Sequence, residues 1–112
     1  MRFSPRRVRA PIHAVAEYRL SLRTRGDLVD IYVFSQANFG RYQADAYYAG
    51  LERTFGLIAD FPGIGINSDE LVVGYRRFRF QSHYVFYSEE AGHVLIRALI
   101  HVRQSLRPEL FE

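Results

Sequence analysis

Three apolar runs near the C-terminus constrain the fold of this chain most strongly. They are "LVVGYRRFRF" (71–80), "HYVFYS" (83–88) and "HVLIRALIHV" (93–102), all rich in β-branched and aromatic residues, which favour strands. Only the turn-like segments 81–82 and 89–92 separate them. Strands joined by such short turns favour an antiparallel meander. The sequence therefore predicts three neighbouring antiparallel strands as the main part of a sheet.

The last of these runs has two unlike faces. One face is uniformly apolar and contains Val94, Ile96, Ala98, Ile100 and Val102. The other is mixed and contains Leu95, Arg97, Leu99 and His101. We expect the apolar face to pack on helices and the mixed face to meet water or a partner.

A strand and two helices are predicted upstream of the meander. Residues 16–21, "AEYRLS", alternate apolar and polar side chains as a strand does. Ser21 is then a suitable cap for a helix, whose core positions Leu28, Ile31 and Tyr32 recur at helical spacing. Gly40 ends that helix and a longer one follows at once. Its apolar stripe comprises Ala44, Tyr47, Tyr48, Leu51, Phe55 and Ile58.

So short a connection predicts an antiparallel helical hairpin. The fold class is therefore α+β: a two-layer arrangement in which an N-terminal strand and an antiparallel helical hairpin pack on a mostly antiparallel sheet.

Composition limits what such a domain can do. A chain of 112 residues suits a single domain, which we assign to residues 15–112, after a basic and flexible arm at 1–14. The chain has no cysteine, and its four histidines lack metal-ligand spacing, so we expect no metal site. No apolar run approaches the roughly 20 residues that cross a membrane, and we expect a cytoplasmic protein without a membrane partner.

Several of these segments together are similar to a known family. They include "DLVDIYVF", "QADAYYAGLERTFGLIADFPGIG", "DELVVGYRRF", "SHYVFY" and "VLIRALIHVR". In this combination, from about residue 18 to 107, the chain resembles the ParE toxins of bacterial type II toxin–antitoxin modules, within the RelE/ParE superfamily. The resemblance implies a toxin that inhibits DNA gyrase and is neutralised by a ParD-like antitoxin. It implies neither metal nor cofactor, and contact with DNA only indirectly, through the antitoxin.

Two alternative functions are considered beside this one. RelE-type relatives are ribosome-dependent mRNA endoribonucleases, and fold alone does not decide function. Those relatives place a basic residue where this chain has Tyr84, and a tyrosine near the C-terminus, whereas the last tyrosine here is Tyr87. Arg103 alone fits the set, so the ribonuclease constellation is incomplete and we expect no enzyme. The second alternative is an RNA-binding module, because all 15 basic residues are arginine.

Two groups of residues are predicted to bind the antitoxin. Strand parity puts Tyr75, Arg77 and Arg79 on an outward face, beside Leu95, Arg97 and Leu99 of the last strand. Aliphatic side chains between arginines suit a protein partner that carries carboxylates. The second group is Val29, Val33 and Phe34, which widen the apolar surface of the first helix beyond its core face.

Four further residues carry expectations. Arg76 has inward parity and is expected to reach outward or to pair with Asp69 or Glu70. Arg103 and Arg107, beyond the last strand, are candidate contacts for gyrase. His83 and His101 are interpreted as strand-end residues that hydrogen-bond locally rather than as an acid–base pair.

Overall fold

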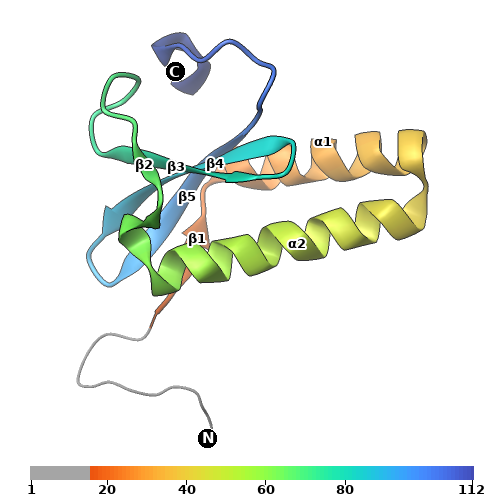
Figure 1. Cartoon of the computed structure of the whole chain (residues 1–112), viewed down its shortest axis with the longest axis horizontal. Helices are drawn as coiled ribbons and strands as arrows, with labels where there is room; N and C mark the ends of the chain where they lie inside the picture. The colour runs from red at the N-terminus through yellow and green to blue at the C-terminus, as the bar shows by residue number, and fades with distance from the viewer. Residues whose placement is uncertain (1–15) are drawn as a thin grey trace, which may run out of the picture.

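The computed structural model describes residues 16–112, and the predicted arm at 1–14 lies outside this range. Helices α1 (Leu22–Phe39) and α2 (Arg41–Asp60) form the expected hairpin, which projects beyond the sheet (Figure 1). The five-stranded sheet has the order β1-β5-β4-β3-β2. Its strands are β1 (Tyr18–Leu20), β2 (Ile66–Asn67), β3 (Tyr75–Phe80), β4 (His83–Glu90) and β5 (His93–His101). The α+β class and the predicted element order are confirmed.

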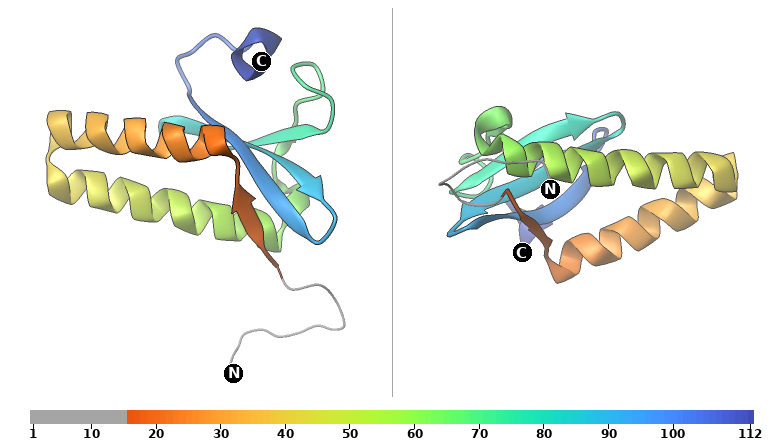
Figure 2. Two further views of the ribbon diagram at one scale, coloured as in Figure 1. Left: turned by 180° about the vertical axis from the view of Figure 1, so that it is seen from behind. Right: turned by 90° about the horizontal axis from the view of Figure 1, so that it is seen from below.

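The sheet is antiparallel except where β1 joins it. The pairs β2–β3, β3–β4 and β4–β5 are antiparallel, whereas β1 runs parallel to β5, with Tyr18 opposite Val94. The parallel pair is possible because the whole helical hairpin and the meander separate the two strands in sequence. Figure 2 shows β1 beside β5, with both helices on one side of the sheet.

The main core lies between the hairpin and the sheet. Phe55, Leu51 and Ile58 of α2 are fully buried and pack with Leu28 of α1 and with the helix-facing residues of the sheet. Ile31 and Tyr47 are partly buried at its margin. Most residues of the predicted apolar stripes therefore face the sheet as expected. Tyr48 does not, because it is 38% exposed and its ring lies against that of Tyr32 of α1.

Two segments differ from the sequence prediction, one a turn and one a short strand. The run from Leu71 to Gly74 is a turn rather than the start of a strand, and β3 begins at Tyr75. Gly74 has a φ of 89°, a left-handed conformation that glycine adopts without strain. The short edge strand Ile66–Asn67, between α2 and β3, is not among the strands predicted from the sequence.

Within residues 16–112, neither helix is long and apolar enough to span a membrane.

Candidate protein-interaction surfaces

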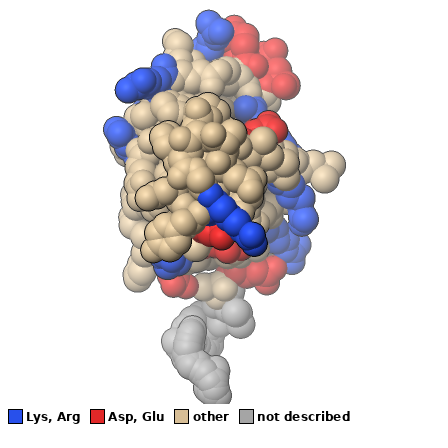
Figure 3. All heavy atoms as spheres, turned by 90° about the vertical axis from the view of Figure 1, so that its right-hand side faces the viewer, with Lys and Arg blue, Asp and Glu red and all other residues tan. Residues whose placement is uncertain are grey.

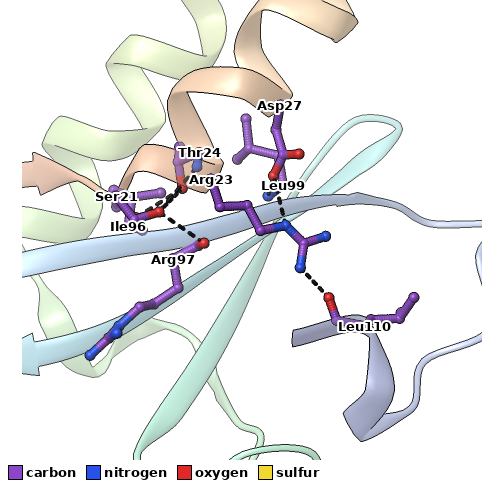
Figure 4. A network of polar contacts seen from close by, with 8 residues as sticks. All are labelled: Ser21, Arg23, Thr24, Asp27, Ile96, Arg97, Leu99 and Leu110. Atoms are coloured by element: carbon purple, nitrogen blue, oxygen red, sulfur yellow. Dashed lines mark hydrogen bonds and ion pairs between the residues drawn. The ribbon is translucent and has the colours of Figure 1, made fainter. Parts of the chain in front are cut away.

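The first turns of α1 are fixed onto the middle of β5 (Figure 4). Ser21 caps the helix by accepting the Thr24 backbone N–H at 3.0 Å, as predicted, and its Oγ also donates to the Arg97 carbonyl at 3.0 Å. The Thr24 hydroxyl donates to the Ile96 carbonyl at 2.8 Å. One turn later, Asp27 accepts the Leu99 backbone N–H at 3.0 Å. Three of these four contacts satisfy backbone groups of β5, at Ile96, Arg97 and Leu99.

At the same place β5 carries a bulge, at Arg97. Phe86 lies opposite Ala98, but the next residue of β4, Tyr87, lies opposite Ile96. Arg97 is thus the extra residue, and a bulge of one residue reverses which face the following side chains take. The strict alternation predicted for β5 is wrong beyond this point.

The reversal corrects four predicted positions. Leu99, predicted on the outward face, is only 5% exposed and packs with Leu28 in the helix-side core, so it is not available to a partner. His101 also lies on the helix side, opposite His83. Conversely, Ala98 and Ile100, predicted under the helices, belong to a second cluster around Phe86 on the opposite face.

We call that opposite face, away from the helices, the distal face. The structure brings five of the predicted antitoxin-binding residues together there: Tyr75, Arg77, Arg79, Leu95 and Arg97. Only Arg79 among them is exposed, and its Nε donates to the Gln81 carbonyl at 2.8 Å. The others are half-buried, so the distal face is more tightly organised than a solvated strand surface.

Arg77 is held by three neighbours. Its Nη1 donates to Ser68 Oγ at 2.9 Å and pairs with Glu70 at 3.3 Å, while its guanidinium lies 5.5 Å from the Tyr84 ring centroid. Glu70 had been expected to pair with Arg76. Instead Arg76 donates to the Gly65 carbonyl at 2.8 Å, because its helix-side parity points it away from the loop that carries Glu70.

Arg97 is held in a parallel way. Its Nε donates to Ser88 Oγ at 2.9 Å and its Nη2 pairs with Glu90 at 3.3 Å. The guanidinium lies 5.3 Å from the Tyr75 ring centroid. The Ser88 hydroxyl donates to Glu90 at 2.7 Å, and this hydrogen bond, with the nearby Arg97, lowers the pKa of Glu90.

The C-terminal segment, Leu106–Phe111, covers the apolar part of the distal face. Leu106, Leu110 and Phe111 pack against the Phe86 cluster, and the Phe111 ring lies 4.8 Å from the ring of Phe86. Arg23 of α1 donates to the Leu110 carbonyl and ties the segment to the helix. Periodicity did not assign these residues to the core; the available sequence signal was their three apolar side chains close to Pro108. The structure forms a 3-10 turn at Pro108–Phe111.

The predicted apolar residues of α1 are exposed. Val29, Val33 and Phe34 are 61%, 58% and 63% exposed. Phe39 and Tyr42 add further exposed aromatic surface near the turn of the hairpin, and Figure 3 shows this end of the molecule as a broad area with few charged side chains. Phe34 and Phe39 also line a cavity of about 730 Å³ between the hairpin and the β3–β4 turn.

His83 and His101 line the same cavity and face one another, with ring centroids 5.2 Å apart. Burial, with the nearby His101, lowers the pKa of His83 to about 4. His101 Nδ1 accepts the Arg103 backbone N–H at 3.1 Å, so the proton of the neutral ring sits on Nε2. His83 Nδ1 lies 2.7 Å from Tyr47 Oη, so both rings are engaged locally as predicted. Within residues 16–112 no group of three or more metal-ligating side chains is assembled.

Arg103 lies between β5 and the C-terminal segment, Arg107 lies within that segment, and both are exposed. Nothing in their surroundings assigns them a partner.

Comparison with known proteins places this fold in a family. A family model described as the ParE toxin of the type II toxin–antitoxin system parDE matches residues 18–106. The chain belongs to the ParE toxin family. It is 42% identical to Toxin ParE1 of Caulobacter vibrioides over 82 residues, which cover 73% of this chain and 85% of the relative. The resemblance drawn from the sequence is thus confirmed, and the chain is a ParE-type toxin of a type II toxin–antitoxin system.

A solved structure supports the ParE fold independently. The chromosomal ParDE toxin–antitoxin system from P. aeruginosa contains a chain that superimposes with a TM-score of 0.69, covering 78% of this chain and 96% of that one. Their sequences are only 13% identical, so this likeness bears on the fold alone.

Proposed function

We propose that this ParE-family toxin inhibits DNA gyrase and is neutralised by a ParD-like antitoxin in the cytoplasm. The observation that carries the proposal is the family match, which spans every helix and strand of the described structure. We further propose that it acts by binding rather than by catalysis. The pKa of His83, about 4, leaves this residue a weak base at neutral pH.

We propose that the antitoxin uses two surfaces. One is the distal face, where Tyr75, Arg77, Arg79, Leu95 and Arg97 offer cations among apolar groups. The other is the exposed row of α1, formed by Val29, Val33 and Phe34. An apolar surface of this kind on a small domain is typical of a partner site.

The first test concerns the target. Purified toxin should inhibit DNA supercoiling by gyrase, and an equimolar ParD-like antitoxin should restore it. In cells, induction without antitoxin should slow DNA synthesis before protein synthesis in pulse-labelling experiments. Ribosome-dependent mRNA cleavage with normal supercoiling would contradict the gyrase proposal and favour a RelE-like activity.

The second test concerns the gyrase contact. We propose Arg103 and Arg107 because they are exposed and outside the antitoxin surfaces. Arg103→Glu and Arg107→Glu should weaken gyrase inhibition while antitoxin affinity stays unchanged. Arg53→Glu, at an exposed position of α2, is the matched charge control. Inhibition that survives both substitutions would remove these residues from the gyrase surface.

A further inference from the structure

The two arginine clusters of the distal face are built by the same sequence pattern. "SDELVVGYRR" (68–77) and "SEEAGHVLIR" (88–97) both read serine, two acidic residues, six residues and arginine. In both copies the arginine contacts the serine nine positions earlier and the second acidic residue seven positions earlier. Each guanidinium also lies over a tyrosine ring, Tyr84 or Tyr75. The pattern thus places two alike cation sites on one face of the sheet.

Serine and tyrosine hold each arginine more firmly than its glutamate does. The two Arg–Ser hydrogen bonds are 2.9 Å long, whereas both Arg–Glu distances are 3.3 Å, longer than the roughly 2.7–2.9 Å of a strong charge-assisted bond. Glu70 makes a single contact, and Arg77 Nε has no hydrogen-bond partner among residues 16–112. The bidentate pairing that a guanidinium can make with a carboxylate is therefore not used by Glu70.

The glutamates are also the more accessible members of the two clusters. The Glu70 side chain is 62% exposed and that of Arg77 only 18%; the corresponding values for Glu90 and Arg97 are 36% and 34%. Exposed ion pairs of this kind contribute only about 0–1 kcal/mol. Glu70, which makes one contact, can therefore turn away at little cost while Arg77 stays over Tyr84. Glu90 must also give up the 2.7 Å hydrogen bond from Ser88, so its displacement costs more.

We infer that Glu70 and Glu90 are internal stand-ins for two carboxylates of an acidic partner segment, and that they compete with that segment for Arg77 and Arg97. The inference rests on the proposed function, because it takes the partner to be the antitoxin. Arg97 lies over the ring of Tyr75. Tyr75 is two residues from Arg77 on the same face of β3, a spacing of about 7 Å along the strand. One extended or helical segment can therefore reach both arginines.

An acidic peptide fits this face better than a nucleic acid does. Each arginine is already paired with one glutamate carboxylate. A carboxylate of the peptide can therefore take the place of that glutamate without changing the local charge. A phosphate backbone would instead need uncompensated cations in a row. The half-buried Leu95, two residues before Arg97 on the same face, also suits an aliphatic side chain of a peptide.

The test measures antitoxin affinity for variants that remove the internal carboxylates. Glu70→Gln and Glu90→Gln should each tighten binding about two- to five-fold, since each removes a competing exposed pair. Glu89→Gln is the matched control: it removes the same charge next to Glu90, but Glu89 pairs with Val94 and so has helix-side parity. Glu89→Gln should leave the affinity unchanged. In an Arg97→Gln background, Glu90→Gln should also have no effect.

The outcomes separate this inference from the proposed function. If the antitoxin binds the unmodified toxin but Glu70→Gln and Glu90→Gln bind equally or more weakly, the glutamates are supports rather than competitors, and only the inference fails. If the antitoxin does not bind the unmodified toxin, the proposed function is wrong, and the inference, which rests on it, is wrong as well. A 20-nucleotide single-stranded RNA of mixed sequence serves as a second probe. Tighter RNA binding by the glutamine variants, with antitoxin affinity unchanged, would replace the peptide by a nucleic acid.

Discussion

Tyr47 Oη lies 2.7 Å from His83 Nδ1 and 3.2 Å from the Ser82 backbone nitrogen, whose N–H it accepts. The tyrosine thus fixes both the start of β4 and the ring of the half-buried His83. A charged imidazolium at this place would be poorly hydrated and would face His101. The geometry therefore favours a neutral His83 in the folded protein.

The first prediction is a loss of stability in mild acid that depends on His83. Its pKa is about 4 in the folded protein against 6.5 for the ordinary side chain. Between these values the unfolded chain binds more protons, so the stability present above pH 6.5 falls as the pH is lowered toward 4. The full shift would correspond to about 3 kcal/mol, which we discount to about 1–2 kcal/mol because the ring is only half-buried.

Denaturant unfolding at pH 7.5 and pH 4.5 measures this dependence. The difference in free energy of unfolding between the two pH values should be smaller in His83→Gln than in the unmodified chain. His93→Gln, at the start of β5, is the control and should retain the full difference. An unchanged pH dependence in His83→Gln would show that carboxylates alone account for it.

The second prediction contrasts two glycines inside α2. A Cβ at Gly50 would lie 2.3 Å from Phe80 Cζ, whereas a Cβ at Gly56 would meet nothing within 4 Å. Gly50→Ala should therefore destabilise the fold by about 1–3 kcal/mol through overpacking, despite the better helix propensity of alanine. Gly56→Ala should stabilise it by up to about 1 kcal/mol. Thermal unfolding of both variants measures these effects. Equal shifts in the Tm of Gly50→Ala and Gly56→Ala would mean that the Phe80 ring moves aside freely.

At the scale of elements, the bulge in β5 decides which residues a partner can reach. It places Leu99 in the main core and leaves Arg97 on the distal face. The side chains of α1 make the bulge tolerable, because Ser21, Thr24 and Asp27 bind the backbone groups around it. Helix and bulge are thus one structural unit.

The third prediction tests that unit through Asp27. Asp27→Ala removes the acceptor of the Leu99 N–H in a half-buried place, and an unpaired backbone group there costs about 1–3 kcal/mol. Asp30→Ala, three residues on and exposed, should change the free energy of unfolding by less than about 0.5 kcal/mol. Hydrogen exchange at the Leu99 amide gives a second measurement, and it should accelerate only in the Asp27 variant. Similar unfolding free energies for both variants would show that the hydrogen bond from the Leu99 N–H to Asp27 does not stabilise the fold.

Sequence periodicity predicted the elements better than the site. The two helices, the Ser21 cap and the antiparallel meander follow from local patterns, and these are confirmed. The parallel pairing of β1 with β5 joins distant segments and was not predicted. The bulge could not be found in this way, because Ala98, Leu99 and Ile100 are all apolar and fit either face. Five of the six sheet residues predicted to bind the antitoxin do share the distal face, while Leu99 is lost to the core. Their binding role stays a prediction, as does that of Val29, Val33 and Phe34.

At the scale of the whole molecule, the sheet is covered on both sides. The helical hairpin buries one face, and the C-terminal segment covers the Phe86 cluster on the other. Arg23 connects the two coverings, since it pairs with Asp27 of α1 at 3.4 Å and also donates to the Leu110 carbonyl. The C-terminal segment is therefore part of the folded domain, and a partner on the distal face must bind beside it or displace it.

The last prediction asks how much the C-terminal segment stabilises the fold. Phe111 contacts the rings of Phe86 and Tyr75, at 4.8 and 5.7 Å between centroids, and Arg23 lies 5.8 Å from its ring centroid. Phe111→Ala should cost about 1–3 kcal/mol, below the roughly 3–5 kcal/mol of a fully buried phenylalanine because this ring is half-buried. Tyr42→Ala, at an aromatic position that is 83% exposed, should cost less than about 0.5 kcal/mol. Equal unfolding free energies for both variants would mean that the segment rests on the sheet without stabilising it, and the Phe86 cluster would then be open to a partner at almost no cost.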